Sequence, residues 1–398
     1  MQTIYVDNNA TTAIAPEVVA AMQQYFTADY FNPSSMYDAA RSAAHAIQAA
    51  RETIARCLGG FDPEQLLFTG SATESNNSAL FGCVQANQQR RHLITTAVEH
   101  PSVLEIGKEL ARRGLEVTFL PVDHNGELSI EAYVKALRSD TLMVSVMMAN
   151  NETGVCYPVG ELARIAKETD PKILVHTDAT QAIGKLQVDL RNDLRQIDLL
   201  AFSGHKIHAP KGVGALFVRR GTRWRPFILG GHQELGRRAG TENVPYIVGL
   251  AKACELAIAG LAEEQTRVRA MRDRLQQALI ERIPAIEVNG KDAAIRLPNT
   301  LNLAIHGIEG EAILFELSNQ GICASSGSAC TSGTLDPSHV LKAMAVPFSA
   351  IHGSLRISLS RYNNDAEIDR IIEVLPEIVT RLRRLSPYWD DKRNCLNL

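Results

Sequence analysis

The sequence lacks the features that would assign the chain to a membrane, a nucleic acid or a secretory route. Its 41 lysines and arginines against 44 aspartates and glutamates give a net charge of −3, so no broad basic field favours nucleic acid. The most apolar runs, such as residues 142–149, are far too short to cross a bilayer. Residues 1–7 contain no basic region followed by an apolar stretch. We therefore expect a globular, cytoplasmic protein.

Cysteine is sparse and shows no pattern. The seven cysteines are odd in number and form no C-x-x-C pair, which argues against a disulfide framework or a closed zinc site. No Walker A sequence and no strand–G-x-G-x-x-G–helix unit is present, so a nucleotide is not the favoured ligand.

Residues 15–260 alternate between helical patterns and short apolar runs. A helix is predicted over residues 35–58, where Gly59 and Gly60 end it. Seven runs have the length of strands: 66–68, 93–95, 117–120, 142–146, 173–175, 199–202 and 215–218. Short apolar runs separated by helices indicate a mainly parallel seven-stranded sheet that is buried on both faces. We predict that residues 15–260 form a large α/β domain.

The remaining residues, 1–14 and 261–398, are predicted to form a smaller α+β domain. It would contain a charged helix and a last helix, with short strands between them: residues 263–283, 300–304, 355–358 and 364–385. Asn364 and Glu367 have the spacing of a capping box at the start of the last helix. Pro376 interrupts the apolar stripe of that helix and predicts a kink or a short break.

Polar residues follow several of the strand-like runs, where α/β sheets place their ligand sites. Lys206 follows the run 199–202 and could form a Schiff base once its amine loses a proton. A surface lysine is the alternative, and the S-x-x-K pattern of Ser203 and Lys206 lacks the other motifs of serine acylases. Asp178 could keep a pyridoxal nitrogen protonated, with Gln181 near the phenolic oxygen; the alternative for Asp178 is a helix N-cap.

Two strand-to-helix turns complete the pattern expected of a cofactor site. Gly70 to Thr73, including Ala72, would offer backbone N–H groups and a hydroxyl to an anion. His100, just before Pro101, could stack on a ring and move protons, or could be only a cap. Asn151 and Arg356 could bind a substrate carboxylate, although an ordinary turn and an internal salt bridge explain these two residues equally well.

Residues 323–334 are almost all small and predict a mobile segment. Cys330 lies near its middle, and a mobile thiol suits a nucleophile that carries something away. Cys323 is predicted to be buried and inert. A metal site built from these two cysteines is conceivable but has no local histidine.

Together these stretches resemble the cysteine desulfurases, in particular the long-loop group that serves nitrogenase maturation and iron–sulfur cluster assembly. The resemblance runs from residue 4 to about residue 389 in family order. It rests on the Cys330 segment and on DNNATT (7–12), NPSS (32–35), ATESNN (72–77), EHP (99–101), NNETG (150–154), DATQ (178–181), SGHK (203–206) and RAGTEN (238–243).

The resemblance implies an aspartate-aminotransferase-like fold (fold type I), a homodimer and pyridoxal 5′-phosphate (PLP). Lys206 would bind the cofactor as a Schiff base, Asp178 would pair with the ring nitrogen and Gln181 with the phenolic oxygen. The phosphate would be bound by Thr73, Ser203, His205 and, from the other subunit, Thr241. Ala72 and Asn151 would be further cofactor-binding residues. His100 would stack on the ring, and Asn151 and Arg356 would hold the substrate carboxylate.

The reaction implied is the transfer of sulfur from L-cysteine to Cys330, which leaves a persulfide and L-alanine. The sulfur would pass to an iron–sulfur scaffold protein, with Cys330 as a transient ligand of the nascent cluster. The short segment after Trp389 favours the nitrogen-fixation type. The rival functions are selenocysteine lyase, class-V aminotransferase and a non-catalytic sulfur relay. An aminotransferase needs no mobile thiol, and Lys206 with Asp178 argues against the non-catalytic relay.

Overall fold

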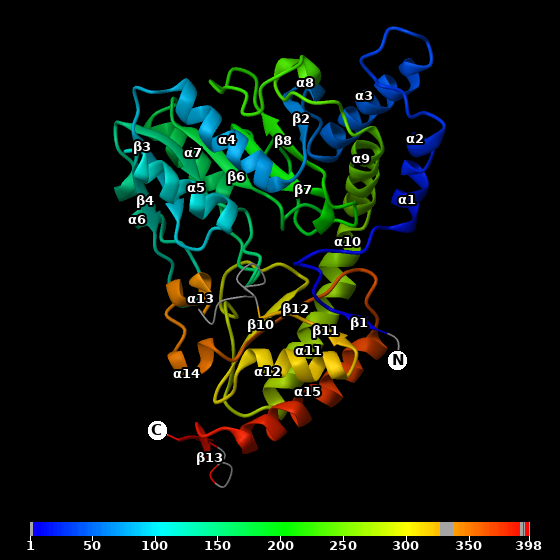
Figure 1. The fold of residues 1–398 in the computed structure, drawn as a ribbon. Coiled ribbons are helices and arrows are strands. Elements are labelled where there is room, and N and C mark those ends of the chain that lie inside the picture. Colours follow the sequence, from blue (N-terminus) through cyan, green and yellow to red (C-terminus); the bar gives the residue numbers. More distant parts are fainter. Residues whose placement is uncertain (1–2, 327–336, 391–392, 394, 398) are drawn as a thin grey trace.

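A computed structural model describes residues 3–326, 337–390, 393 and 395–397 (Figure 1). Cys330 lies outside these residues. The seven predicted strands all form, as β2 (Leu66–Thr69), β3 (His92–Thr96), β4 (Glu116–Leu120), β5 (Thr141–Ser145), β6 (Leu174–Asp178), β7 (Leu199–Ser203) and β8 (Gly214–Val218). They build one sheet in the order β2-β8-β7-β6-β5-β3-β4, in which only β8 runs against its neighbours. The prediction of a mainly parallel seven-stranded sheet is confirmed.

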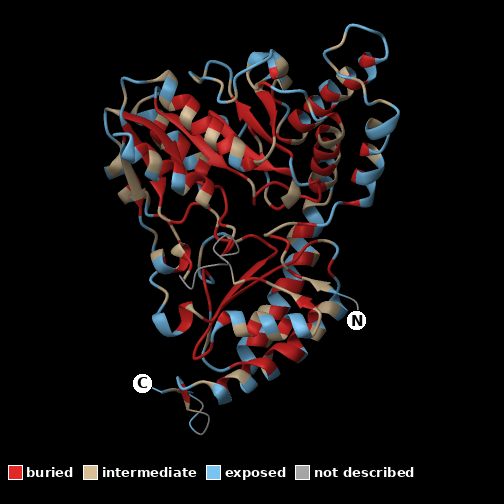
Figure 2. Cartoon of the chain, in the orientation of Figure 1, coloured by how far each residue is buried: buried red, intermediate tan, exposed pale blue. Residues whose placement is uncertain are grey.

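Helices cover both faces of this sheet because successive strand residues point to opposite sides. Leu67 and Leu93 pack with α4 (Ala72–Ala86) and α5 (Pro101–Arg112). Phe68 and Ile94 pack on the other side, in the core formed with α3 (Ala40–Cys57), α7 (Val159–Thr169) and α9 (Val244–Ala259). Figure 2 shows the strands of this sheet buried along almost their whole length, except for the edge strand β4, which is only partly buried.

A second, antiparallel sheet lies below the first in Figure 1 and has the order β12-β10-β9. Its strands are β9 (Ile286–Val288), β10 (Thr300–Ile305) and β12 (Ser354–Ser358). It shares a core with α11 (Arg269–Arg282), α12 (Gly310–Asn319) and α15 (Asp365–Leu385). Close to it, β1 (Ile4–Tyr5) pairs with β11 (Ile322–Cys323). The N-terminal segment therefore belongs to the same half of the molecule as the C-terminal helix.

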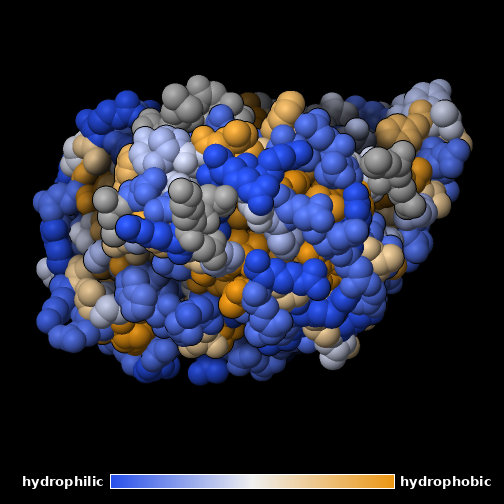
Figure 3. All heavy atoms as spheres, turned by 90° about the horizontal axis from the view of Figure 1, so that it is seen from below, coloured by the Kyte–Doolittle hydropathy of each residue, from blue (hydrophilic) through white to orange (hydrophobic). Residues whose placement is uncertain are grey.

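The shorter elements connect these layers. They are α1 (Pro16–Met22), α2 (Gln24–Thr27), α6 (Ile130–Ala136), α8 (Gln233–Gly236), α10 (Leu261–Glu263), α13 (His339–Ala343), α14 (Phe348–Ile351), β13 (Trp389–Asp390), β14 (Cys395–Leu396) and one-turn helices at 63–65 and 204–206. Figure 3, a view from below, shows a mostly hydrophilic exterior with smaller hydrophobic areas. No single helix among the described residues is long and apolar enough to span a membrane. The helices 244–259 and 261–282, which are bent by 50° relative to each other, reach that length and apolar character only when they are taken together.

Three predicted details differ from the structure. The helix expected over residues 35–58 begins only at Ala40, because Ser34 N–H donates to the side chain of Asn32 and the residues before Ala40 form turns. The helix expected over 263–283 contains a π-helical segment at Glu264–Val268.

Of the kink or short break predicted at Pro376, the break is absent, because α15 continues through this residue, and the kink stays a prediction. Proline has no N–H to give to the carbonyl four residues earlier. That carbonyl belongs to Ile372, and it accepts a hydrogen bond from the Arg282 guanidinium at 3.4 Å. A neighbouring helix thus supplies the missing donor.

The capping box at the start of α15 yields a stability prediction. Glu367 N–H donates to Asn364 Oδ1 and Asn364 N–H donates to Glu367 Oε2, as the sequence predicted. Asn364→Ala should lower the free energy of unfolding by about 1 kcal/mol, because the Glu367 N–H in the first turn loses its acceptor. Urea unfolding measures the loss, and Glu377→Ala, at an exposed position of the same helix, should change little. Equal losses in both variants would contradict the assignment.

Candidate active site

A cavity of about 250 Å³ opens at the carboxyl edge of the large sheet, facing the small sheet. Ten of the residues predicted for the site line it: Ala72, Thr73, His100, Asn151, Asp178, Gln181, Ser203, His205, Lys206 and Arg356. Six strands point the same way, so the turns after β2, β3, β5, β6 and β7 meet at this edge. The topology therefore brings together residues that are far apart in the sequence.

The turn between β2 and α4 has the geometry of an anion site. Ser71 caps α4 by accepting a hydrogen bond from Glu74 N–H at 3.1 Å, and Gly70 N–H donates to Glu74 Oε2 at 2.8 Å. Thr73, in the first turn of this 15-residue helix, is exposed to the cavity. The start of the helix carries a partial positive charge and unpaired N–H groups, which favour an anionic ligand group.

Ser203 and His205 face the same cavity from the end of β7. His205 Nδ1 lies 3.2 Å from the hydroxyl oxygen of Thr11. Burial, reinforced by Lys206 and Lys211, lowers the pKa of His205 to about 3. The imidazole is therefore neutral at physiological pH and can act as a hydrogen-bonding group.

Lys206 extends its amine to the N-terminal segment. Its Nζ donates to the carbonyl oxygens of Asn9 and Ala10, both at 2.7 Å. Asn9 is itself held by side-chain bonds to Thr300 Oγ1 at 2.8 Å and to Asn151 O at 3.2 Å. The amine position is thus fixed by a segment almost 200 residues away in the sequence. Asn9 and Ala10 had no predicted role, although both lie in the DNNATT motif.

Asp178 ends β6 and accepts two hydrogen bonds in a buried position. Asn76 Nδ2 donates to Asp178 Oδ2 at 2.7 Å, and Thr180 N–H donates to Asp178 Oδ1 at 2.9 Å. The bond from Thr180 is a local turn contact, and no helix starts here, so the N-cap alternative is wrong. Gln181 donates from Nε2 to Asn9 O at 3.0 Å. Its buried Oε1 has no hydrogen-bond partner among the described residues, which indicates that a polar ligand group belongs nearby.

Arg356 is 2% exposed and lines the cavity from β12. Its guanidinium pairs with Asp7 Oδ1 at 2.7 Å and donates to Asn151 O at 3.0 Å. The internal salt bridge considered for this residue therefore exists. Because the guanidinium also borders the cavity, the salt bridge does not conflict with binding of an anion there.

The two remaining site predictions are not placed in this cavity. Thr241 is exposed, in the segment between α8 and α9, and does not line it. Cys330 lies outside the described residues, and so does its predicted contact with a metal.

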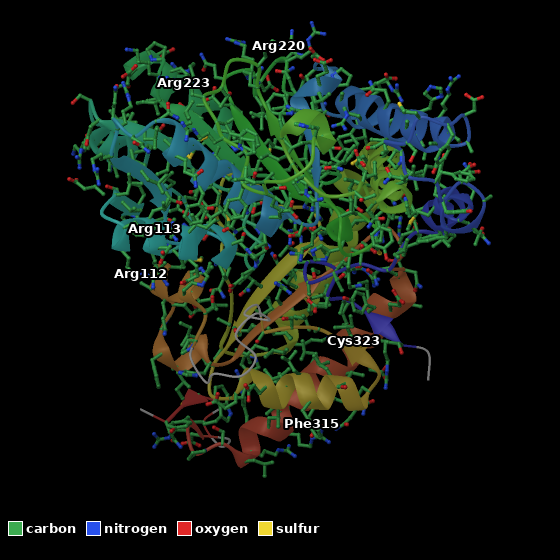
Figure 4. All side chains as sticks on the ribbon, turned by 45° about the horizontal axis from the view of Figure 1, so that its top comes forward. Arg112, Arg113, Arg220, Arg223, Phe315 and Cys323 are labelled. Atoms are coloured by element: carbon green, nitrogen blue, oxygen red, sulfur yellow. The ribbon has the colours of Figure 1, made fainter. Side chains whose placement is uncertain are left out.

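Cys323 is only partly buried, so the prediction of a buried thiol is wrong. This residue lies on the short strand β11, beside β1 (Figure 4). No cluster of three or more potential metal ligands occurs among the described residues.

The residues of the cavity fit the PLP expected from the sequence. One cavity contains a primary amine, a buried carboxylate, a buried amide with an unpaired oxygen and an anion-binding helix start. Two residues near them had no predicted role: Ser102, which also lines the cavity, and the buried Asn76. No sequence signal distinguishes Ser102 from an ordinary first-turn serine.

Comparison with known proteins agrees with this geometry. Residues 4–371 match the family described as Aminotransferase class-V. The chain is 50% identical over 396 residues to "Cysteine desulfurase" of Trichormus azollae, covering 100% of this chain and 98% of the relative. It is 49% identical over 389 residues to "Cysteine desulfurase NifS" of Azotobacter vinelandii, covering 98% and 96%.

Two solved structures have the same fold. One is described as "NIFS-LIKE PROTEIN", with a TM-score of 0.90 and 37% identity over 96% of this chain and 100% of that one. The other, "SspA in complex with cysteine", has a TM-score of 0.79 and 34% identity over 91% and 100%.

A Schiff base at Lys206 predicts the colour of the protein. Lys206→Ala should abolish the visible absorbance of the purified protein, because no other group would hold the aldehyde covalently. The matched control is Lys211→Ala, an exposed lysine five residues on, which should remain yellow. Thermal unfolding shows whether each variant is folded. A folded Lys206→Ala protein with unchanged absorbance after dialysis would refute the assignment.

Proposed function

The chain belongs to the aminotransferase class-V family, and on that premise we propose that it is a cysteine desulfurase, which converts L-cysteine to L-alanine and transfers the sulfur. The observation that carries the proposal is the gathering of Lys206, Asp178 and an anion-binding turn in one cavity. The relatives named cysteine desulfurase match over nearly their whole length, and one structural neighbour is described as a complex with cysteine.

The family is PLP-dependent, and the residues of the cavity define how the cofactor would be held. Lys206 would bind its aldehyde, Asp178 its ring nitrogen and Gln181 its phenolic oxygen. Ala72, Thr73, Ser203 and His205 would bind its phosphate, and His100 would lie against its ring. When bound, PLP supplies an electron sink for the pair released at the substrate carbon.

Arg356 and Asn151 would hold the substrate carboxylate. A guanidinium meets a carboxylate with two parallel hydrogen bonds, and this one is already fixed by Asp7. Its charge is therefore partly compensated before substrate arrives, which limits the cost of keeping it buried. The amine of Lys206, once released from the aldehyde, is the base that takes the proton from the substrate α-carbon.

Cys330 is the proposed sulfur acceptor. Its thiolate attacks the substrate sulfur, so that a sulfur–sulfur bond forms while the bond between the substrate β-carbon and sulfur breaks. The three-carbon fragment keeps the electron pair of the broken bond and is protonated to alanine. The persulfide is then the form in which sulfur leaves the site.

The destination of the sulfur follows from the resemblance. We propose an iron–sulfur scaffold protein as the acceptor, with Cys330 as a transient ligand of the nascent cluster. Service to nitrogenase maturation and a cytoplasmic location are further parts of the same proposal.

A homodimer with Thr241 reaching into the partner subunit's cavity is supported by the segment 227–243. Leu229 and Leu235 are 80% and 67% exposed, and Phe227 in the same segment is 41% exposed, so the segment presents three large apolar side chains at the surface. Arg238 pairs with Glu74 at 2.9 Å, which anchors the segment and holds Thr241 outward. An anchored loop with exposed leucines is expected to pack against another subunit.

The acceptor role of Cys330 is tested by product analysis. The purified protein, with L-cysteine and a thiol reductant, should form sulfide and alanine in equal amounts. Cys330→Ala should stay yellow and form neither product at an appreciable rate. Cys395→Ala, which removes an exposed cysteine, should keep full turnover. Normal turnover by Cys330→Ala would reject the role, and turnover confined to selenocysteine would favour a selenocysteine lyase.

The exchange of Thr241 between subunits is tested with mixed dimers. Thr241→Ala should weaken PLP binding about tenfold, the effect of one hydrogen bond to a charged group. A mixed dimer of Lys206→Ala and Thr241→Ala subunits should contain one site with wild-type affinity, because its Thr241 comes from the other chain. A monomer in sedimentation, or weakened binding at that site, would contradict the exchange.

A further inference from the structure

A continuous series of hydrogen bonds joins Asp178 to His100 through two buried side chains. Asn76 Nδ2 donates to Asp178 Oδ2 at 2.7 Å and to Ser102 Oγ at 2.9 Å. Ser102 Oγ lies 2.8 Å from His100 Nδ1. Asn76 is fully buried in α4, and Ser102 is in the first turn of α5. The series connects the two side chains expected at the edge and at the face of the cofactor ring.

The direction of the first two bonds is set by Asp178. Both of its carboxylate oxygens accept hydrogen bonds, one from Thr180 N–H and one from Asn76. The amide atom of Asn76 that faces it must therefore be Nδ2, because the flipped amide would place two acceptor oxygens in contact. The second N–H of the same nitrogen then points to Ser102 Oγ.

The direction of the last bond follows from the hydroxyl. Ser102 Oγ has one hydrogen, and since the oxygen accepts from Asn76, this hydrogen is left for His100 Nδ1. The backbone N–H of Ser102 also donates to His100 Nδ1, at 3.1 Å. An Nδ1 that accepts two hydrogen bonds carries no proton, so the single ring proton is on Nε2.

We propose that Asn76 and Ser102 are positioning residues that hold His100 as the neutral Nε2–H tautomer. In the resting protein His100 then offers the cavity a hydrogen-bond donor and not a base, which leaves proton removal from the substrate to Lys206. The use of this donor in catalysis rests on the proposed desulfurase activity. The directions of the hydrogen bonds between Asp178 and His100 do not depend on that activity.

The charged surroundings of His100 are consistent with a neutral ring. Burial lowers its pKa, and the nearby Lys206 and His339 act in the same direction, whereas Asp178 opposes them. The two bonds to the Nδ1 lone pair exist only while the ring is neutral, so they also favour this form. Removing one of them should raise the pKa of His100.

The test is the nitrogen NMR spectrum of the protein labelled with ¹⁵N-histidine, without and with PLP. The wild-type protein should show His100 with a protonated Nε2 and an unprotonated Nδ1 at neutral pH, the signals being assigned with His100→Gln. Ser102→Ala should produce a mixture of tautomers and raise the pKa of His100 by about half a unit to one unit. Asn76→Leu should also produce a mixture, because the Ser102 hydroxyl is then free to rotate.

Two further variants separate positioning from general damage. Ser102→Thr keeps the hydroxyl and should keep the wild-type tautomer. Ser78→Ala, which removes another buried hydroxyl from α4, should leave His100 unchanged. If Ser102→Ala unfolds at the wild-type temperature but retains the wild-type tautomer and pKa, the proposal is wrong. If instead the wild-type protein forms no sulfide from L-cysteine, the proposed desulfurase function is wrong, but the proposed tautomer of His100 is still decided by the NMR spectrum.

Discussion

The contact between the Lys206 amine and the carbonyls of Asn9 and Ala10 is the interaction on which the site depends. It connects the edge of the large sheet to the N-terminal segment, which is bound in turn to the small sheet. Asn8 Nδ2 donates to Ser358 O at 2.9 Å, and Asn9 N–H donates to Ser358 Oγ at the same distance. The N-terminal segment therefore contacts both halves of the molecule, and its residues Asn9 and Ala10 line the cavity.

Electrostatics in the cavity follow from burial. Burial lowers the pKa of the half-buried His205 to about 3 and that of the buried His176, two residues before Asp178 on β6, to about 4, so neither imidazole adds positive charge. Among the described residues that line the cavity, the lysine and arginine side chains are Lys206 and Arg356, and Arg356 forms an ion pair with Asp7. Such a site attracts anionic groups to these individual side chains, without a positive field over the whole cavity.

Much of the fold could be predicted because a parallel sheet covered on both faces requires continuous apolar strands. Most strands between residues 66 and 218 contain such a run, and the polar residues after β2, β3, β5, β6 and β7 mark the carboxyl edge. Asp178 and Lys206 were found for this reason. The sequence also showed the capping box of α15, because that motif is local.

What the sequence could not show depends on contacts between distant residues. Asn9 is 197 positions from Lys206, and nothing local indicates that its carbonyl would meet an amine. Pro376 predicts a kink or a short break, and the local sequence does not show that Arg282 supplies the missing donor, so that the helix continues without a break. Cys323 resembles a buried thiol in its apolar local sequence, but it lies on a short two-stranded sheet that leaves it partly exposed.

The position of the N-terminal segment between the two halves of the molecule also determines when the cavity is completed during synthesis. The segment 7–12 is synthesised long before its partners Arg356 and Ser358. A nascent chain can complete the large sheet, Lys206 included, while its N-terminal segment still lacks these partners. The Lys206 amine is therefore enclosed only after residues 356–358 have been made, so a product truncated before them would present an incomplete site.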